Sequence, residues 1–312
     1  MTRRTLALAG LILAALASPL PVSAQAPSSV PPALAAAGVQ RFVFDGWAGP
    51  ALPVWYLRPA HAGPDAPVLF VMHGVRRDAD RYIGEWVDLA TRHGLVVVVP
   101  EFSEASFPRA LNYNHGRLVT DTGAPRPRAE WSFAVIEPLF DAIVARERLG
   151  TRDYVLYGHS AGAQYVHRHA LTGGAPRMRL AIAANAGSYM YPAAEVDWPF
   201  GARGLPAGAF DPARAFAQPL VLLLGTADDD PRHPSLPDQP GARAQGPHRL
   251  ARGQGFYAYG RAAAGPAFAW RCALAPGVGH DNGAMAPFAL ALVLGRASPA
   301  PGTDCAPIAP VR

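Results

Sequence analysis

The fold of this chain is decided by residues 154–171, which read YVLYGHSAGAQYVHRHAL. Tyr154–Tyr157 is an apolar run typical of a buried strand, and Ala161–Leu171 has the length and composition of a helix. The turn between them reads GHSAG, so Ser160 has a glycine two residues away on each side. Side chains at those two positions would clash in a strand-to-helix turn that presents a serine hydroxyl for reaction. We therefore predict that Ser160 is a nucleophile, with a purely structural turn as the alternative.

Outward from this stretch, short apolar runs alternate with helical patterns. Two early runs, Arg41–Phe44 and Val54–Leu57, favour antiparallel strands. Further strands are predicted at Val68–Met72, Leu95–Val99, Leu180–Ala184, Leu220–Leu224 and Phe268–Leu274, and helices at Asp78–His93, Trp131–Arg148, Gly246–Ala264 and Asn282–Leu294, with Gly94 and Gly150 as helix stops. This alternation predicts an α/β fold, with a mostly parallel sheet covered by helices on both faces. Ligands of such sheets bind at the carboxyl ends of the strands.

Two stretches interrupt the alternation, Phe102–Arg128 and Ser188–Gln218, and both are rich in proline, glycine and aromatic residues. Loops of this length inside a compact domain are usually functional lids or rims, with plain surface insertion as the alternative. We predict an aromatic, substrate-binding rim, whose candidates are Tyr113, Tyr189, Tyr191 and Trp198, with Trp131 and Phe200 beside them. The alternative is that several of these rings only pack the loops against the domain.

A serine hydroxyl becomes a good nucleophile only when a base removes its proton, so one of the ten histidines has to serve. His280 is the best candidate because it follows the last strand-like run directly, which places it at the same sheet edge as Ser160. His159 lies beside the nucleophile and points elsewhere in such a turn, while His167 and His169 lie on the following helix. For these three we expect packed or surface histidines.

A carboxylate should orient the imidazole and stabilise its charged form. The strand Leu220–Leu224 is followed by three adjacent acids, Asp228, Asp229 and Asp230, again at a carboxyl edge. We favour Asp228, the first to leave the strand, with Asp230 as the alternative. Three acids with His233 nearby also suit a calcium site, but the spacing of a regular calcium loop is absent from the sequence.

Acyl transfer also needs hydrogen-bond donors for the oxyanion that develops on the substrate. The main-chain N–H of Ala161, at the start of the helix after Ser160, is one predicted donor. The other is expected in the loop after Val68–Met72, which reads HGVRR, and we assign it to the N–H of Val75. Gly74 permits close approach of the main chain in this loop. The two arginines that follow are either solvated or contact an acidic group of the substrate.

The HGVRR loop, the GHSAG turn, Asp228 and the late His280 together resemble the α/β-hydrolase superfamily, over the span from Arg41 to Leu294. Within it, the chain is similar to exported esterases grouped with polyhydroxybutyrate depolymerases and feruloyl esterase-like hydrolases. The resemblance implies the α/β-hydrolase fold, a small or polymeric carboxylic ester as substrate, and neither cofactor nor metal. It also implies the chain order nucleophile, acid, base for Ser160, Asp228 and His280, and hydrolysis through an acyl-enzyme intermediate.

Other functions remain open for this fold. A peptidase would need a site for a chain terminus or a cap domain, whereas an acyltransferase or perhydrolase differs only in the nucleophile that meets the acyl-enzyme. A binding protein that kept the fold without catalysis is a different class of function. Such proteins usually lack the serine, the histidine or the acid, and all three are available here in order.

The composition excludes several mechanisms. All 28 basic residues are arginine, which rules out Ser-Lys dyads, Schiff bases and phosphate-binding loops that depend on lysine. The net charge of +5 comes without a basic cluster of the kind that binds nucleic acid, so we expect no nucleic-acid partner.

The first 24 residues predict a secretory signal peptide. Arg3 and Arg4 precede an apolar run, Leu6–Leu16, and small residues end the segment at Ala24. The general and the twin-arginine export routes both stay open. A membrane anchor is the less favoured alternative because the apolar run is short, so we expect a periplasmic or secreted protein without stable membrane insertion.

The predicted domain organisation is a signal peptide at 1–24, a linker at 25–40, a hydrolase domain at 41–296 and a tail at 297–312. In an oxidising compartment, the cysteine pair Cys272 and Cys305 favours a disulfide that ties this tail to the domain. Two free thiols are the alternative.

Overall fold

The computed structural model describes residues 29–172 and 174–311. The predicted signal peptide, residues 1–24, lies outside them, as do residues 25–28 of the predicted linker. Within the described chain, nine strands form one sheet in the order β1-β2-β4-β3-β5-β6-β7-β8-β9. β1 is antiparallel to β2 and β2 to β4, and all other neighbours are parallel. The predicted α/β fold with a mostly parallel sheet is therefore confirmed.

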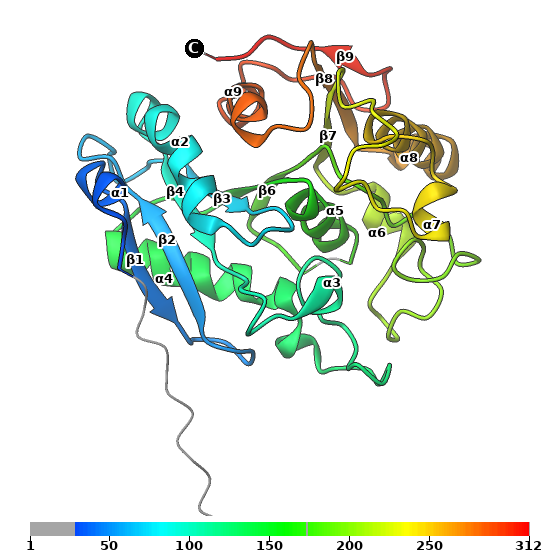
Figure 1. Cartoon of the computed structure of the whole chain (residues 1–312), viewed down its shortest axis with the longest axis horizontal. Coiled ribbons are helices and arrows are strands. Elements are labelled where there is room, and N and C mark those ends of the chain that lie inside the picture. Colours follow the sequence, from blue (N-terminus) through cyan, green and yellow to red (C-terminus); the bar gives the residue numbers. More distant parts are fainter. Residues whose placement is uncertain (1–28, 173, 312) are drawn as a thin grey trace, which may run out of the picture.

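The strands and helices are shown in Figure 1. The strands are β1 (Gln40–Phe44), β2 (Leu52–Leu57), β3 (Val68–Met72), β4 (Val96–Pro100), β5 (Tyr154–His159), β6 (Met178–Ala184), β7 (Leu220–Gly225), β8 (Arg271–Ala275) and β9 (Ala306–Pro307). The helices are α1 (Pro32–Ala36), α2 (Ala79–His93), α3 (Arg109–Asn112), α4 (Ile136–Glu147), α5 (Ala161–Thr172), α6 (Pro212–Phe216), α7 (Pro240–Arg243), α8 (Arg249–Ala264) and α9 (Asn282–Val293), with 3₁₀ turns at Arg128–Glu130, Ser132–Val135 and Gly265–Ala267.

Both faces of the sheet are buried, because successive side chains of a strand point to opposite faces. Val68, Phe70 and Met72 of β3 belong to one hydrophobic core, to which α4, α5 and α8 contribute. Leu69 and Val71 belong to a second core, to which α2 and α9 contribute. Figure 1 shows these two sets of helices on either side of the sheet. Burial on both sides explains why these strands read as continuous apolar runs.

The helix predicted for Trp131–Arg148 is shorter than expected. A 3₁₀ turn occupies Ser132–Val135, and the α-helix begins only after it. Pro138 explains the difference, because proline lacks an N–H for the helical ladder and is tolerated only in the first turn. Arg148 caps the helix with a left-handed φ of 50°. Gly150 is therefore not the stop residue; its N–H donates to the carbonyl of a neighbouring loop.

Both ends of the described chain are attached to the domain. Part of the predicted linker forms α1, and Leu34 of this helix packs against the core that contains α2 and α9. At the other end, Cys272 and Cys305 form a disulfide, which confirms the predicted pairing. β9, within the predicted tail, adds to the edge of the sheet beside β8. The tail is thus held by a covalent bond and by strand pairing.

Candidate active site

Ser160 lies in a tight turn between β5 and α5, with a left-handed φ of 59°. The two glycines of the GHSAG motif make this turn possible. A Cβ on Gly158 would lie 2.4 Å from the main chain of Gly162, and a Cβ on Gly162 would lie 2.0 Å from the carbonyl oxygen of Met72. Larger residues at either position would force the turn apart, so the sequence spacing has a direct steric cause. The turn places the Ser160 hydroxyl at the carboxyl edge of the sheet.

The structure brings together Ser160 and the two residues named from the sequence as its base and acid, His280 and Asp228. His280 Nε2 lies 3.0 Å from Ser160 Oγ, and His280 Nδ1 lies 2.7 Å from Asp228 Oδ2. Asp228 follows β7 and His280 follows β8, and these strands are parallel neighbours that end at the same edge. Of the other two acids in this cluster, Asp229 and Asp230 are both exposed, and Asp230 accepts a hydrogen bond from a main-chain N–H of its own loop.

Asn185, which the sequence analysis missed, ties together the loops that carry the acid and the base. It follows β6 and has a left-handed φ of 51°. Its Oδ1 accepts from the N–H of Gly225 at 2.8 Å, and its Nδ2 donates to the carbonyl of Gly279 at 3.1 Å. Gly225 ends β7 and Gly279 directly precedes His280, so one buried amide fixes the relative position of both loops.

Asp228 is buried and makes a second charged contact that the sequence did not indicate. Its Oδ1 lies 3.3 Å from Arg249 Nη1, and the side chains of the two residues are 3% and 1% exposed. Arg249 Nη2 also donates to Ser235 Oγ at 3.0 Å. Arg249 is the first residue of α8, and no local pattern in the sequence marks it as a partner of Asp228. One carboxylate thus joins the imidazole on one side and a buried guanidinium on the other.

The electrostatics keep His280 in its neutral form. Burial lowers the pKa of His280 most strongly, the hydrogen bond that its ring donates to Asp228 opposes this, and the charge of Arg249 lowers the pKa further. Two more imidazole rings lie against it, His159 at 4.6 Å and His233 at 5.0 Å between ring centroids. Burial holds the pKa of His159 well below its usual value, so this neighbour is neutral as well. A neutral His280 is able to accept a proton from Ser160.

The two residues predicted to supply oxyanion donors, Ala161 and Val75, line the same cavity as Ser160. Ala161 is the first residue of α5, and the first N–H groups of a helix have no partner within it. Val75 lines the same cavity as Ser160 and Ala161, and its side chain is exposed. A Cβ on Gly74 would lie 2.7 Å from the hydroxyl oxygen of Tyr82, so glycine is needed for the loop to pass at this point. These positions suit a pair of oxyanion donors.

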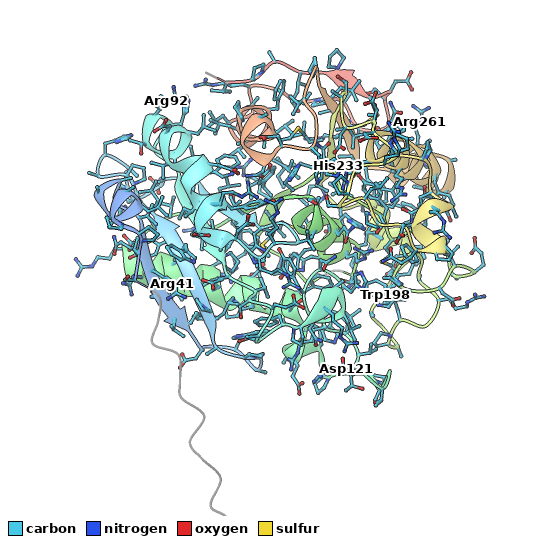
Figure 2. All side chains as sticks on the ribbon, in the orientation of Figure 1. Arg41, Arg92, Asp121, Trp198, His233 and Arg261 are labelled. Atoms are coloured by element: carbon cyan, nitrogen blue, oxygen red, sulfur yellow. A yellow bond between two sulfur atoms is a disulfide. The ribbon has the colours of Figure 1, made fainter. Side chains whose placement is uncertain are left out.

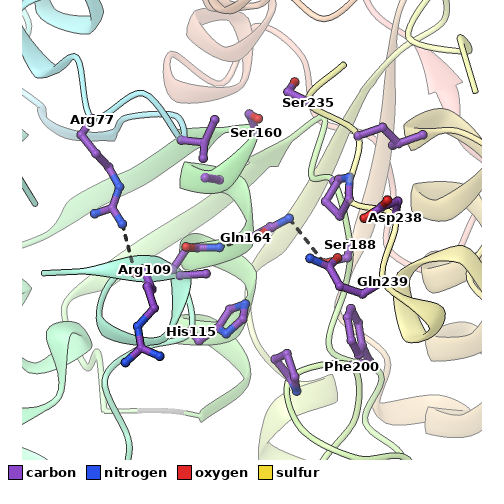
Figure 3. A pocket seen from close by; sticks show the side chains of 18 of the residues that line it. Arg77, Arg109, His115, Ser160, Gln164, Ser188, Phe200, Ser235, Asp238 and Gln239 are labelled. Carbon is purple, nitrogen blue, oxygen red and sulfur yellow. Dashed lines mark hydrogen bonds between the residues drawn. The ribbon is translucent and has the colours of Figure 1, made fainter. Parts of the chain in front are cut away.

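Ser160 lies between two cavities. The larger one measures about 590 Å³ and also contacts both irregular segments. The smaller one measures about 430 Å³ and contains His280 beside Ser160. Figure 3 shows the larger cavity, with Ser160 on one side and Gln164, His115, Ser188 and Phe200 around it. His233 lies on the loop between β7 and α7, is labelled above the centre of Figure 2, and lines the smaller cavity.

The predicted aromatic rim is largely turned inward. Tyr113 and Tyr189 have no exposed surface. Tyr191 packs on two rings of α8, and Trp198 lies against His115 at 6.1 Å between ring centroids. Trp131 is also buried, and of the six aromatic residues named from the sequence, Phe200 is the one in the described lining of the larger cavity. Tyr113, Tyr189 and Trp131 belong to the hydrophobic core that contains β3, and Tyr191 and Trp198 pack against it, so these rings pack the irregular segments against the domain.

The two arginines after Val75 have different environments. Arg77 donates to the carbonyls of Phe102, Phe107 and Arg109 and pairs with Glu104 at 3.2 Å, so it braces the first irregular segment. Arg76 is exposed, lines the smaller cavity and forms no ion pair with any described residue. Within residues 29–172 and 174–311, no group of three or more His, Cys, Asp and Glu side chains is placed to hold a metal ion.

No family model matches this chain, and no curated protein matches it. Among solved structures, poly(aspartic acid) hydrolase-1 from Sphingomonas sp. KT-1 is 43% identical, with a TM-score of 0.78 over 82% of this chain and 98% of that one. LpqC, a poly(3-hydroxybutyrate) depolymerase from Bordetella parapertussis, is 34% identical, with a TM-score of 0.77 over 85% of this chain and 93% of that one. An S-formylglutathione hydrolase from Agrobacterium tumefaciens shares the fold at 17% identity, with a TM-score of 0.54 over 83% of this chain and 95% of that one.

Proposed function

From the premise that this chain belongs to the α/β-hydrolase superfamily and is a serine hydrolase, we propose that it cleaves carboxylic esters through an acyl-enzyme on Ser160. His280 is the general base, and Asp228 is the acid that orients it. The observation that carries this proposal is the unbroken chain of contacts, 3.0 Å from Ser160 Oγ to His280 Nε2 and 2.7 Å from His280 Nδ1 to Asp228 Oδ2. The order of roles matches the serine-histidine-aspartate pattern of acyl transfer.

In the first step, His280 takes the proton of the Ser160 hydroxyl while the oxygen attacks the ester carbonyl. The N–H groups of Val75 and Ala161 bind the oxyanion of the tetrahedral intermediate. When the intermediate collapses, the carbon–oxygen bond to the alcohol breaks and His280 gives its proton to that oxygen. In the second step water attacks the acyl-enzyme and His280 takes its proton. The bond between the acyl carbon and Ser160 Oγ then breaks, His280 returns the proton to that oxygen, and the free acid leaves.

We assign the alcohol and the acyl group of the substrate to different cavities. The leaving alcohol has to lie near His280, because its oxygen receives the proton that His280 carries. The smaller cavity contains His280 and therefore suits the leaving group. The larger cavity contains Ser160, Val75 and Ala161 without His280 in its lining, and therefore suits the acyl group.

A second candidate function is cleavage of amide bonds in an anionic chain. The solved structure with 43% identity is that of a poly(aspartic acid) hydrolase. On this chain the supporting observation is Arg76, an exposed guanidinium in the leaving-group cavity that makes no ion pair with a described residue. The same acyl-enzyme chemistry serves amides, with an amine in place of the alcohol as leaving group.

The proposal includes export. The Cys272–Cys305 disulfide supports an oxidising compartment, where such bonds persist. Within the described parts of the chain, no helix has the length and apolar character needed to cross a membrane. Cell fractionation followed by mass spectrometry of the N-terminus tests export and the predicted cleavage after Ala24 together.

The test of catalysis is hydrolysis of p-nitrophenyl esters from acetate to palmitate, and of poly(aspartic acid), by the mature protein. Ser160→Ala and His280→Ala should abolish ester cleavage while the proteins stay folded, and a fluorophosphonate should label only proteins in which Ser160 is present and activated by His280. His61→Ala is the matched control, because His61 is exposed and lines neither cavity. A wild-type protein that is inert to every substrate and is not labelled would favour the non-catalytic binding protein instead.

A further inference from the structure

The larger cavity, to which we assign the acyl group and which we call the acyl cavity, has a polar wall of three connected side chains. We call these side chains, Asn114, Gln164 and Ser188, the amide relay. Asn114 Nδ2 donates to Gln164 Oε1, and Gln164 Nε2 donates to Ser188 Oγ at 3.4 Å. The three residues are 4%, 7% and 3% exposed, and all three line the cavity. Figure 3 shows Gln164 at the centre of this wall, with its two contacts dashed. Buried polar groups inside a substrate cavity are unfavourable unless something satisfies them.

The amide relay has hydrogen-bonding capacity to spare. A glutamine amide has two N–H donors and two carbonyl lone pairs. The described contacts use one donor and one lone pair of Gln164. One N–H and one lone pair therefore remain for a group in the cavity. The hydroxyl of Ser188 accepts from Gln164 and keeps its own hydrogen for a further acceptor.

The position of Gln164 relates it directly to the acyl group. Gln164 lies one helical turn after Ser160 on α5, and its N–H donates to the Ser160 carbonyl at 3.1 Å. Ser160 and Gln164 both line the acyl cavity. An acyl chain that runs from Ser160 into this cavity therefore passes the Gln164 amide.

The surroundings hold the amide relay in place. A Cβ on Gly187 would lie 3.0 Å from Gln164 Nε2, so the glycine leaves just enough room for this amide. Below it, the buried Arg168 donates to the main-chain carbonyls of Gln164 at 3.2 Å, Asn114 at 3.4 Å and Pro199 at 3.0 Å. These contacts connect both irregular segments to α5. The polar wall is thus built into the domain and does not depend on mobile surface side chains.

We infer that Gln164 determines acyl specificity: the enzyme takes short acyl groups that carry a neutral hydrogen-bonding group, a hydroxyl or an amide, near the carbonyl. This inference rests on the proposed acyl-enzyme at Ser160. A purely alkyl acyl group would displace water from the amide relay without replacing its hydrogen bonds, which lowers its rate of acylation relative to a polar acyl group.

The experiment compares kcat/KM for two p-nitrophenyl esters of equal size, β-hydroxybutyrate and isovalerate, which differ by a hydroxyl in place of a methyl. The ratio of the two values is measured for wild type and for Gln164→Met, which keeps the side-chain length and removes the amide. Intrinsic differences in ester reactivity cancel when the two ratios are divided. We expect the variant to lower the polar-to-alkyl ratio by about tenfold, the effect of one hydrogen bond, mainly through loss of the hydroxy ester.

Gln254→Met is the control, because Gln254 is an exposed glutamine of α8 outside both cavities, and its ratio should equal that of wild type. Fluorophosphonate labelling reports whether each variant keeps an assembled site. If Gln164→Met is not labelled, Ser188→Ala takes its place, with the same fall in ratio expected. An unchanged ratio in the labelled variant overturns the inference and leaves the proposed function standing. A wild type that is labelled but cleaves neither ester also overturns the inference, whereas a wild type that is inert to both esters and is not labelled overturns the function itself.

Discussion

The carboxyl edge of the sheet and the two irregular segments, Phe102–Arg128 and Ser188–Gln218, meet around Ser160 but are built in different ways. At the edge, parallel strands end side by side, so the main chain itself delivers Asp228 and His280. In the segments, buried arginines hold the chain by its carbonyls, as Arg77 and Arg168 do. The edge carries the three residues of the proposed triad, and both segments line the larger cavity in front of Ser160.

The largest expected effect comes from a change at the edge. Asp228→Asn keeps the size of the side chain and removes the charge that stabilises the His280 imidazolium. By analogy with the serine protease triad, kcat should fall about 10⁴-fold with little change in KM. Steady-state kinetics on a p-nitrophenyl ester measure this.

Asp230→Asn is the matched control for that variant. It belongs to the same cluster of three acids but is exposed, and its Oδ1 accepts only from the main-chain N–H of Arg232. We expect kcat to stay within about twofold of wild type, as for most surface changes. The reverse result, with Asp230→Asn inactive and Asp228→Asn active, would assign the acid to Asp230 and require a different arrangement of this loop.

The positions of residues at the carboxyl edge of the sheet were largely predictable from the sequence, because they depend on local sterics and on the direction of the strands. The GHSAG turn follows from steric exclusion at Gly158 and Gly162, and the positions after β7 and β8 follow from the shared direction of parallel strands. The strand runs were likewise readable, since β3 matches its predicted bounds at both ends. The hydrophobic pattern alone predicts too early a start for the helix before β5, because Pro138 is tolerated only in the first helical turn.

The segments were not predictable, because their structure depends on contacts between residues far apart in the chain. No local pattern around Tyr113 indicates that its hydroxyl donates to the carbonyl of His73, forty residues away. The Arg249–Asp228 pair and the amide bridge of Asn185 are hidden for the same reason. Aromatic composition alone therefore suggested a rim where the structure has an internal core.

The second prediction concerns the ion pair between Arg249 of α8 and Asp228 at the carboxyl edge of the sheet. Arg249→Met removes the guanidinium from Asp228 and Ser235. Loss of one partner from a buried ion pair costs about 3 kcal/mol of stability or more. We also expect kcat near neutral pH to fall about tenfold, as for loss of about 1.4 kcal/mol of transition-state stabilisation, because Asp228 loses the contact that fixes its second oxygen. Arg249 is a positioning residue, so KM should change little.

The pH dependence of kcat/KM distinguishes a positioning role of Arg249 from a role in stability alone. The charge of Arg249 lowers the pKa of His280, so its removal raises that pKa. In the proposed mechanism, His280 works as a base only when neutral, so activity should be lost as pH falls through its pKa. The acid limb of kcat/KM should therefore move to higher pH in Arg249→Met. Arg252→Met is the control, because Arg252 is buried on the same helix and donates to carbonyls of Gly187, Pro237 and Gly246. It should lose stability without moving this limb.

The smallest expected effect tests the inward-facing aromatic residues. Tyr113→Phe removes a hydroxyl that donates to the His73 carbonyl at 2.8 Å and keeps the ring on which Arg77 lies at 4.4 Å. Loss of one buried hydrogen bond should lower the free energy of unfolding by about 1 kcal/mol. Urea denaturation measures this change, and kcat and KM should stay within about twofold of wild type because no substrate reaches a fully buried ring.

Phe200→Ala gives the opposite pattern and sharpens the distinction between core and cavity. Phe200 lines the acyl cavity and is only partly buried, so its loss removes apolar contact with the acyl group. KM should rise by about threefold to tenfold, as for loss of about 1 kcal/mol of binding, with a smaller effect on stability than a core substitution would have. If Tyr113→Phe raised KM and Phe200→Ala did not, the first irregular segment would have to open when substrate binds. The packing of the irregular segments seen here would then be that of the free enzyme only.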